Sequence, residues 1–545
     1  MTSRSLGHRA PLLWLVLPMI AGLAAGQAGE AARPGGLLAG ALVAGAISLA
    51  WVEKPRVWAI GMVTAGLLAG LASYGLNRAR LPAWDALPPR EARLSLRVER
   101  TFSTVDPKKV AGLAVVVRSD DHLRELAGQR IYFSLALKKG EVAPVRTAVV
   151  TTVGVLTALP RNPPGDTFDG YLAGAGMNFR LSRGRVIAEE QPASGYARFC
   201  ARASARFNAI LGLGIAVKRP ELAGLLRAMM LGETHELSEE QHELFRKSGT
   251  MHLFAISGLN IAVIAGALLM LLAPLRRWPL VRFAVGAALL WLFVDITGAA
   301  PSAVRAFVMA VFLQAAFVLR LPANVLAALV GSAAVVLIVA PLQVFGASFV
   351  MSYGIVAALL LLGLPLGEAW VTWWSPAADL PKVTWRWWHH AASAGWRWLA
   401  AALAVGGATT LVGLLTGLHY FGLLTPGALF TNLALIPAAG LVTLAGFASL
   451  VCGLLGWVGG AVLGNHAAAL LLLGIERVVA GSVTVPGAFV AAHFSATWIG
   501  GAALAGLGAG LLAGYALGWR RERWSFYWAP FALVAAVLVF GVTFG

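Results

Sequence analysis

Charged residues are scarce in this chain: they make up 12% of its 545 residues, whereas 58% of the residues are hydrophobic. Soluble domains carry about 25% charged residues, so a soluble fold of this composition would lack the groups to cover its surface. The same figures exclude a disordered chain and a coiled coil. Repeated apolar runs of roughly 20 residues instead predict a polytopic α-helical membrane protein.

Cysteine is nearly absent. The two cysteines, Cys200 and Cys452, lie far apart, which excludes a disulfide framework and a CxxC metal pair within either local segment. The ten histidines are scattered, and the doublet His389-His390 has no nearby carboxylate beyond Asp379. We therefore expect no metal site and no cofactor. A Walker A loop is missing as well, so an energy source has to come from outside this chain.

Positive charge is in excess, with 43 Lys and Arg against 25 Asp and Glu and a net charge of +18. One explanation is basic cytoplasmic loops together with attraction to anionic lipid. The other is a polyanionic partner such as nucleic acid. Charge alone does not choose between them.

Three apolar segments open the chain, near residues 11–28, 34–52 and 57–76. Because two further segments follow directly, we expect the first to be a membrane helix and not a cleaved leader. Arg4 and Arg9 precede the first segment, and Lys54 and Arg56 separate the second from the third. The positive-inside rule then places the N-terminus in the cytoplasm and residue 78 on the outer side.

The region 78–195 has a different character, with frequent charges and short runs of alternating polarity. Alternation with a period of two, interrupted by Gly, Pro or Asp, is typical of strands and turns. The five runs are 93–102, 110–118, 130–137, 148–159 and 178–188. Five strands in about 110 residues predict a small extracytoplasmic β-barrel or sandwich, with an OB-like barrel as one candidate.

A helical, amphipathic connector follows over residues 196–250. Arg198, Arg202 and Arg206 recur along one side of its first helix. Ser238, followed by Gln241 three residues later, is a capping signal for a second short helix.

The remaining hydrophobic block predicts ten helices, several of them too short or too interrupted by Gly and Pro to be simple spans. They lie near 252–273, 278–298, 302–319, 322–340, 343–362, 396–418, 426–455, 461–482, 496–518 and 526–544. We divide the chain into 1–77, 78–195, 196–250, a transmembrane domain 251–490 and C-terminal helices 491–545.

Tryptophan is concentrated in residues 368–398, beside Lys382, Arg386 and Arg397. Trp next to Arg is typical of an amphipathic element in the lipid headgroup region. Stacking of nucleobases on the rings is the functional alternative, and the interfacial explanation is the simpler one.

The most informative stretch reads LFRKSGTMHLFAISGLN over residues 244–260. It places a histidine at the mouth of an apolar helix and polar residues one to two turns further on, where polar groups are expensive to bury without a purpose. The motif residues are Gly232, Glu233, Phe245, Ser248 and Gly249 in a lead-in, followed by His252, Ser257, Gly258 and Asn260.

This stretch resembles the signature of the ComEC competence family, in which a Gly-Asp/Glu lead-in and an FxxSGxxH element precede an HLxAISGLH-type motif. The chain departs from that pattern at Asn260, where many members have His. The resemblance continues in a GxxPSxxRA segment at 298–309, in a Pro-Leu turn before a Ser-containing helix at 340–353, and in a helix break at 429–437 that contains Asn432. The region ending at 162–172 also resembles the family's N-terminal domain.

The resemblance implies transport of single-stranded DNA across the cytoplasmic membrane during natural transformation, by a channel-like protein that is not an enzyme. It also implies a DNA receptor, a separate processing nuclease and a cytoplasmic motor as partners. Many members carry a further metallo-β-lactamase-like domain with an HxHxDH metal motif. Nothing similar occurs in these 545 residues, so we expect no nuclease or zinc chemistry from them. A structural or assembly protein without transport activity is the alternative.

Polar residues inside apolar helices are the candidates for a transport path. Arg305 could attract phosphate within a passage, because a lone intramembrane Arg usually faces a partner or water. The alternative is a structural ion pair between Arg305 and Asp295, ten residues earlier. Further candidates for a polar path are Ser302, Gln343, Ser348 and Ser352, although Ser in membrane helices more often packs or bonds its own backbone.

His252 and Ser257 also suggest an intramembrane serine hydrolase. Their spacing of five residues does not place them on one helical face, and no third orienting group is evident. We regard this function as the weakest of the three.

Overall fold

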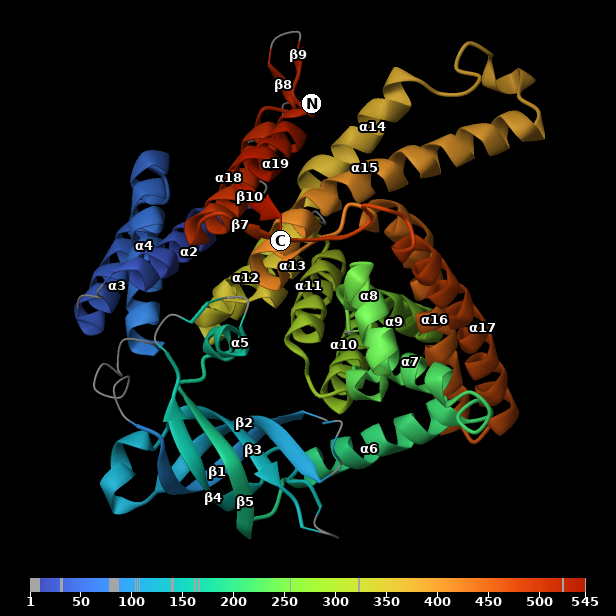
Figure 1. The fold of residues 1–545 in the computed structure, drawn as a ribbon. Helices are drawn as coiled ribbons and strands as arrows, with labels where there is room; N and C mark the ends of the chain where they lie inside the picture. The colour runs from blue at the N-terminus through green and yellow to red at the C-terminus, as the bar shows by residue number, and fades with distance from the viewer. Residues whose placement is uncertain are drawn as a thin grey trace.

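The computed structural model describes residues 10–544 except 30–32, 78–87, 103, 105, 107, 139–141, 161–162, 165–166, 255, 322–323 and 522–523. Arg4 and Arg9, which carry the predicted orientation of the N-terminus, lie outside the described residues, as does Asn162. The described chain is mostly helical, with one closed β-barrel at one end of the molecule (Figure 1).

Three helices form the N-terminal unit, as the three apolar segments predict: α2 (Leu13–Ala28), α3 (Pro34–Ala50) and α4 (Pro55–Asn77). α4 packs against both of the others. A Cβ atom on Gly70 of α4 would lie 2.2 Å from the carbonyl oxygen of Met19 on α2. Only glycine permits this approach, which is the way small residues bring membrane helices together.

Five strands close into a barrel in the order β1-β2-β3-β5-β4, with β3 and β5 parallel and the other neighbours antiparallel. They are β1 (Arg90–Phe102), β2 (Lys109–Ser119), β3 (Arg130–Ala136), β4 (Val149–Ala158) and β5 (Phe179–Gln191). The inward residues, such as Leu94, Leu96 and Phe133, are fully buried. The predicted small OB-like barrel is therefore confirmed, because alternation with a period of two places one face of each strand inside.

The barrel is joined to the helices by α5 (Phe168–Gly174), between β4 and β5, and by α6 (Gly195–Gly212), which follows β5. α7 (Pro220–Leu231), a 3-10 turn and α8 (Glu239–Lys247) complete the connector. Ser238 and Gln241 form a capping box at the start of α8, as their spacing predicts.

In the part of the chain that the structure describes, nine helices are long and apolar enough to cross a membrane. Those after the connector are α9 (Gly258–Leu271), α10 (Pro279–Ile296), α11 (Pro301–Val318), α13 with α14 (Ala347–Trp373), α15 (Trp387–Phe421), α16 (Ala428–Leu454), α17 (Val458–Val483) and α18 (Thr497–Ala516). Four shorter apolar helices are α2, α3, α12 (Val325–Val339) and α19 (Ala529–Phe540). The protein is a multi-pass membrane protein.

The helices after the barrel build two cores. The first bundle consists of α6 to α11 with α16 and α17. The second bundle consists of α12 to α15 with α18 and α19, and α2 packs onto it. α11 lies between them, because its Ala303 and Ala306 are buried in the first core while its Met309 packs against the second. We call the boundary along α11 the seam.

Much of the tryptophan-rich stretch is helical, whereas the sequence predicted a helix only from about residue 396. Its residues form the end of α14, a connecting loop and the first three turns of α15, so that the two helices project as a long hairpin (Figure 1). The indole Nε1 of Trp396 donates to the Trp374 carbonyl oxygen at 2.8 Å and closes the hairpin. α15 is therefore 35 residues long, or about 52 Å, against a hydrocarbon core of about 30 Å.

Two further details depart from the prediction. The segment 526–544 is not one helix, because α19 ends at Phe540 and Val542–Phe544 forms strand β10. β10 pairs with β7 (Val490–Phe494), which pairs with β6 (Leu423–Leu424). Strands of two to five residues are too short to give a recognisable alternation.

Candidate functional site at the seam between the helix bundles

The lead-in residues build a compact turn between α7 and α9. Gly232 ends α7 in the left-handed conformation, with φ of +77°. The Phe245 ring is fully buried, 4.1 Å from the centroid of Phe254. The Ser248 hydroxyl donates to the Phe245 carbonyl oxygen at 3.1 Å, and Gly249 (φ +71°) leaves space for Thr425, three residues before α16. These residues shape the backbone and present no free reactive group.

Ser257 and Asn260 also have structural partners. Ser257 is the N-cap of α9, where its hydroxyl accepts from the Asn260 amide nitrogen at 3.4 Å. The Asn260 side chain is 2% exposed; it donates to the Met229 carbonyl oxygen at 2.9 Å and accepts from the Thr443 hydroxyl at 3.2 Å. Asn260 thus joins α7, α9 and α16, and Gly258 packs at the start of α9.

His252 is exposed, and its Nδ1 lies 3.1 Å from the Gly249 carbonyl oxygen. Among the described residues, His252 and Ser257 make no hydrogen bond to each other. A serine hydrolase needs its nucleophile and base within hydrogen-bond reach, so the structure offers no support for that function. Ser302 donates to the Ile256 carbonyl oxygen at 2.6 Å and anchors α11 to the segment before α9.

Among the candidates, Arg305 has the most unusual combination of burial and hydrogen-bond partners. It belongs to α11 and is 1% exposed, yet its hydrogen-bond partners lie across the seam. Its guanidinium donates from Nη1 to the Gln343 Oε1 at 3.2 Å, and from Nη2 to the Ser348 carbonyl oxygen at 2.7 Å and hydroxyl at 2.6 Å. The Nε atom is buried and has no hydrogen-bond partner.

The charge of Arg305 is not balanced by an acidic side chain among the described residues: its partners are an amide, a hydroxyl and a carbonyl. Buried cations are normally paired with a carboxylate or coordinate an anion. An arginine supported by neutral acceptors, with its Nε donor unpartnered, has the chemistry to bind an anionic ligand such as a phosphate group.

The alternative of an ion pair between Asp295 and Arg305 is wrong. Both carboxylate oxygens of Asp295 accept from Arg146, a residue of the turn before β4, with the Nη2 to Oδ2 distance at 2.9 Å. The Asp295 side chain is 2% exposed, and its hydrogen bonds raise the pKa of the Arg146 guanidinium. The partner comes from the barrel, 149 residues away in the sequence, so spacing along the helices could not reveal it.

The two remaining candidates lie on α13, which contacts α11 at the seam, and on α16, which packs against α9 and α15. Ser352 is half-buried on α13, one turn after Ser348. Asn432 lies on α16, and its Oδ1 is buried without a hydrogen-bond partner. An unsatisfied buried amide oxygen is uncommon in a folded core, so Asn432 shares with Arg305 the property of incomplete hydrogen bonding.

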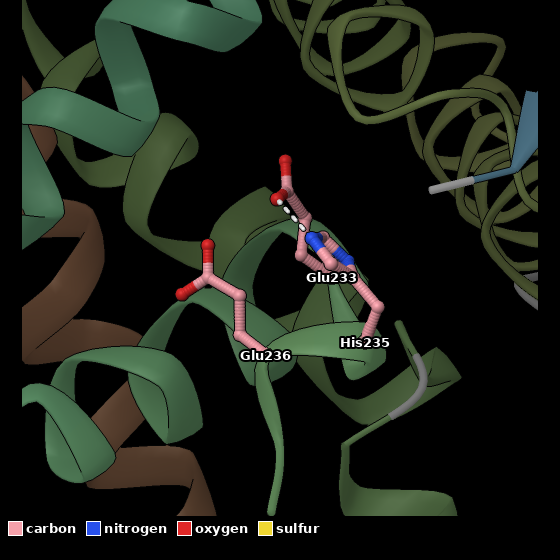
Figure 2. Close-up of side chains that lie close together, drawn as sticks. All are labelled: Glu233, His235 and Glu236. Carbon is pink, nitrogen blue, oxygen red and sulfur yellow. Dashed lines mark ion pairs between the residues drawn. The ribbon is translucent and has the colours of Figure 1, made fainter. Parts of the chain in front are cut away.

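The structure also brings together Glu233, His235 and Glu236 on the turn after α7, with ligand atoms that lie within 4.8 Å of one another (Figure 2). Such a set could hold a metal ion, which the scattered histidines did not suggest. However, Glu236 pairs with Arg227 at 3.0 Å and Glu233 accepts from Asn208 at 2.6 Å. Burial raises the pKa of Glu233. The cluster is thus a partly buried polar network whose carboxylates already have protein partners.

Sequence reasoning missed Arg146 and the Glu233 cluster. The cluster had a visible signal, because two carboxylates and a histidine stand within four residues. Arg146 had none, since its position in a charged loop is ordinary.

Comparison with known proteins gives the chain a family. The family model described as Competence protein matches residues 229–523, which include the lead-in, Arg305 and Asn432. ComE operon protein 3 of Bacillus subtilis (strain 168) is 29% identical over 145 residues, equal to 26% of this chain and 18% of that protein. The alignment thus spans less than a fifth of that relative. No solved structure matches the chain. Because the family model covers more than half of the sequence, the protein belongs to the competence protein family.

Proposed function

We propose that this protein conducts single-stranded DNA across the cytoplasmic membrane during natural transformation. Membership of the competence family supports a role in transformation, and the many apolar helices suit a membrane carrier or channel. In this proposal the chain is a transport protein and not an enzyme. A DNA receptor, a separate nuclease and a cytoplasmic motor work with it.

The observation that carries the proposal is Arg305. A guanidinium in a low-dielectric seam attracts a phosphate far more strongly than the same group does in water. Its partners Gln343 and Ser348 belong to the other bundle, so a strand that follows the seam would meet the cation between two helix layers. Ser348 is exposed, so one of the groups that hold the Arg305 guanidinium lies at the protein surface.

A second observation concerns the connector helix. Arg198, Arg202 and Arg206 are all exposed on α6, which runs from the barrel to the first bundle (Figure 1). Cations in a row raise the local concentration of a polyanion and guide it. The row thus supplies a non-specific binding track ahead of the seam.

The test is Arg305→Gln in a transformable host that lacks its own copy of the gene. Glutamine keeps a donor and much of the length but removes the charge. We expect cytoplasmic uptake of labelled DNA to fall about tenfold or more, which corresponds to about 1.4 kcal/mol, with unchanged membrane insertion. Arg320→Gln is the matched control, because Arg320 follows the same helix and is exposed.

Two results would overturn the proposal. If deletion of the gene leaves uptake of labelled DNA intact, the protein has no transport role. If deletion abolishes uptake while Arg305→Gln and other seam variants transport normally, the protein acts in assembly of the uptake machinery instead.

A further inference from the structure

The turn between α12 and α13, residues 341–346, connects more parts of the molecule than any other short segment described above. We call it the junction turn. Phe345 contacts the Tyr74 ring of α4 edge to face, with centroids 6.2 Å apart. Its carbonyl oxygen accepts from the Tyr420 hydroxyl of α15 at 3.2 Å. Gln343 in the same turn accepts from Arg305.

The barrel also reaches the junction turn. α5 packs against it, and the two backbones approach closely at a pair of glycines: a Cβ atom on Gly174 would lie 3.5 Å from the Cα of Gly346. Both positions have room for a small side chain, because the nearest atom to a Cβ on Gly346 is the Gln343 carbonyl oxygen at 3.4 Å. The barrel therefore contacts the second bundle, through α5 and the junction turn.

The second barrel contact is with the first bundle. Arg146 precedes β4 and holds Asp295, the last residue but one of α10. Separation of this pair would leave a carboxylate that is 98% covered in the docked state without its counter-charge, which is unfavourable. The pair therefore strongly favours the docked position of the barrel.

From these two contacts we propose that the barrel clamps the two helix bundles together across the seam, and that Gln343 is a positioning residue through which the docked barrel holds the Arg305 guanidinium in place. The clamp stands on the geometry alone. Its effect on DNA passage rests on the proposed function.

A disulfide between residues 174 and 346 tests the clamp. The double variant Gly174→Cys with Gly346→Cys is made in a chain whose Cys200 and Cys452 are replaced by Ala. After mild oxidation in membranes, we expect the linked peptide pair to dominate by mass spectrometry. Arg146→Gln should lower the linked fraction several-fold, and the exchange Arg146→Asp with Asp295→Arg should restore it. Arg124→Gln is the control, since Arg124 pairs with Asp121 only on the barrel surface.

The same variants give a functional rescue. Arg146→Gln should reduce DNA uptake, and oxidation of the cysteine pair in that background should restore it, whereas reduction should remove the gain. The clamp would be disproved if the cysteines at 174 and 346 stay unlinked in the protein that retains Arg146, or if Arg146→Gln leaves the linked fraction unchanged. If the linked fraction behaves as expected but uptake never depends on the gene, the clamp stands and the proposed function fails.

Discussion

Two buried asparagines of the first bundle, Asn260 and Asn465, differ from Arg305 at the seam in how completely their polar atoms are hydrogen-bonded. Inside the first bundle, Asn260 has partners on two other helices, and Asn465 donates to the carbonyl oxygens of Ile210 and Leu213 at 2.8 and 3.0 Å while accepting from Ser449 at 2.7 Å. Arg305 Nε at the seam and Asn432 Oδ1 on α16 are buried and unpartnered, as are Asn208 Oδ1 on α6 and Arg282 Nε on α10. Asn260 and Asn465 hold helices together, whereas Arg305 keeps a charged donor that a ligand can still satisfy.

This difference separates two kinds of motif residue. Asn260 and Ser257 lie in the most recognisable part of the sequence. Asn260 nevertheless joins three helices, and Ser257 caps the start of α9. Arg305 lies in a less distinctive segment, but its charge is unbalanced among the described residues. A recognisable motif therefore identifies the family without showing which of its residues bind a ligand.

The largest effect on stability is expected for Asn260→Ala. The change leaves the Met229 carbonyl oxygen without a partner in a dry interior, which costs about 1–3 kcal/mol, while the Thr443 hydroxyl keeps the Ala439 carbonyl oxygen as its acceptor. We expect a clear fall in the thermal midpoint of unfolding in detergent, measured by intrinsic tryptophan fluorescence. Asn260→His, the residue of many relatives, is the informative comparison. If Asn260→Ala unfolds like the parent but loses uptake, Asn260 belongs with the seam residues.

Ser257→Ala removes the N-cap of α9 and should cost about 1 kcal/mol. Because the hydroxyl serves the backbone, we expect DNA uptake to remain at the parent level once the amount of protein is matched. Ser257→Thr, which keeps a capping oxygen, should restore the lost stability. Complete loss of uptake in Ser257→Ala with normal folding would revive the hydrolase hypothesis.

Asn432→Leu tests a residue whose buried amide oxygen has no hydrogen-bond partner. Replacement of an unpartnered buried amide by an apolar group of similar size removes a desolvation penalty, so stability should stay equal or rise by up to about 1 kcal/mol. Uptake should nevertheless fall, because the amide oxygen is then unavailable to a ligand. A variant that is more stable and fully active would exclude a ligand-binding role for Asn432.

Much of the fold was predictable from local patterns. The five barrel strands were located to within about three residues at each end, because alternation and Gly or Pro breaks are local signals. The membrane helices followed from apolar runs of sufficient length. The start of α15 was misplaced because Trp, His and Arg interrupt the apolar pattern without breaking a helix.

The site was less predictable, because its geometry depends on contacts between distant segments. Arg305 was identified as an intramembrane cation, but its partners Gln343 and Ser348 lie about 40 residues away on another bundle. The partner of Asp295 belongs to the barrel, so the nearest opposite charge on the neighbouring helix was the wrong choice. Local patterns therefore locate polar residues in helices but do not pair them.

The smallest effect concerns the Glu233 network, a third, partly wet environment that is neither the bundle interior nor the seam. Burial raises the pKa of Glu233 above its ordinary value of 4.5, despite the neighbouring Arg227 and His235. The native state therefore takes up a proton more readily than the unfolded chain. Stability should fall as pH rises from about 4.5 through the raised native pKa and then stay level.

Glu233→Gln should remove that slope and raise the thermal midpoint slightly at pH 7, because the amide oxygen can still accept from Asn208. The matched control is Glu243→Gln. A hydrogen bond from Lys247 lowers the pKa of the exposed Glu243, so its small contribution has the opposite sign and is lost as pH falls. Thermal midpoints measured from pH 4 to 7 distinguish the contribution of Glu233 from that of Glu243. A Glu233→Gln protein that keeps the parent's pH profile would show that the carboxylate is already stabilised as an anion, by Arg227 or by a bound cation. Titration with a divalent metal, which should raise the midpoint of the parent only in the second case, then decides between them.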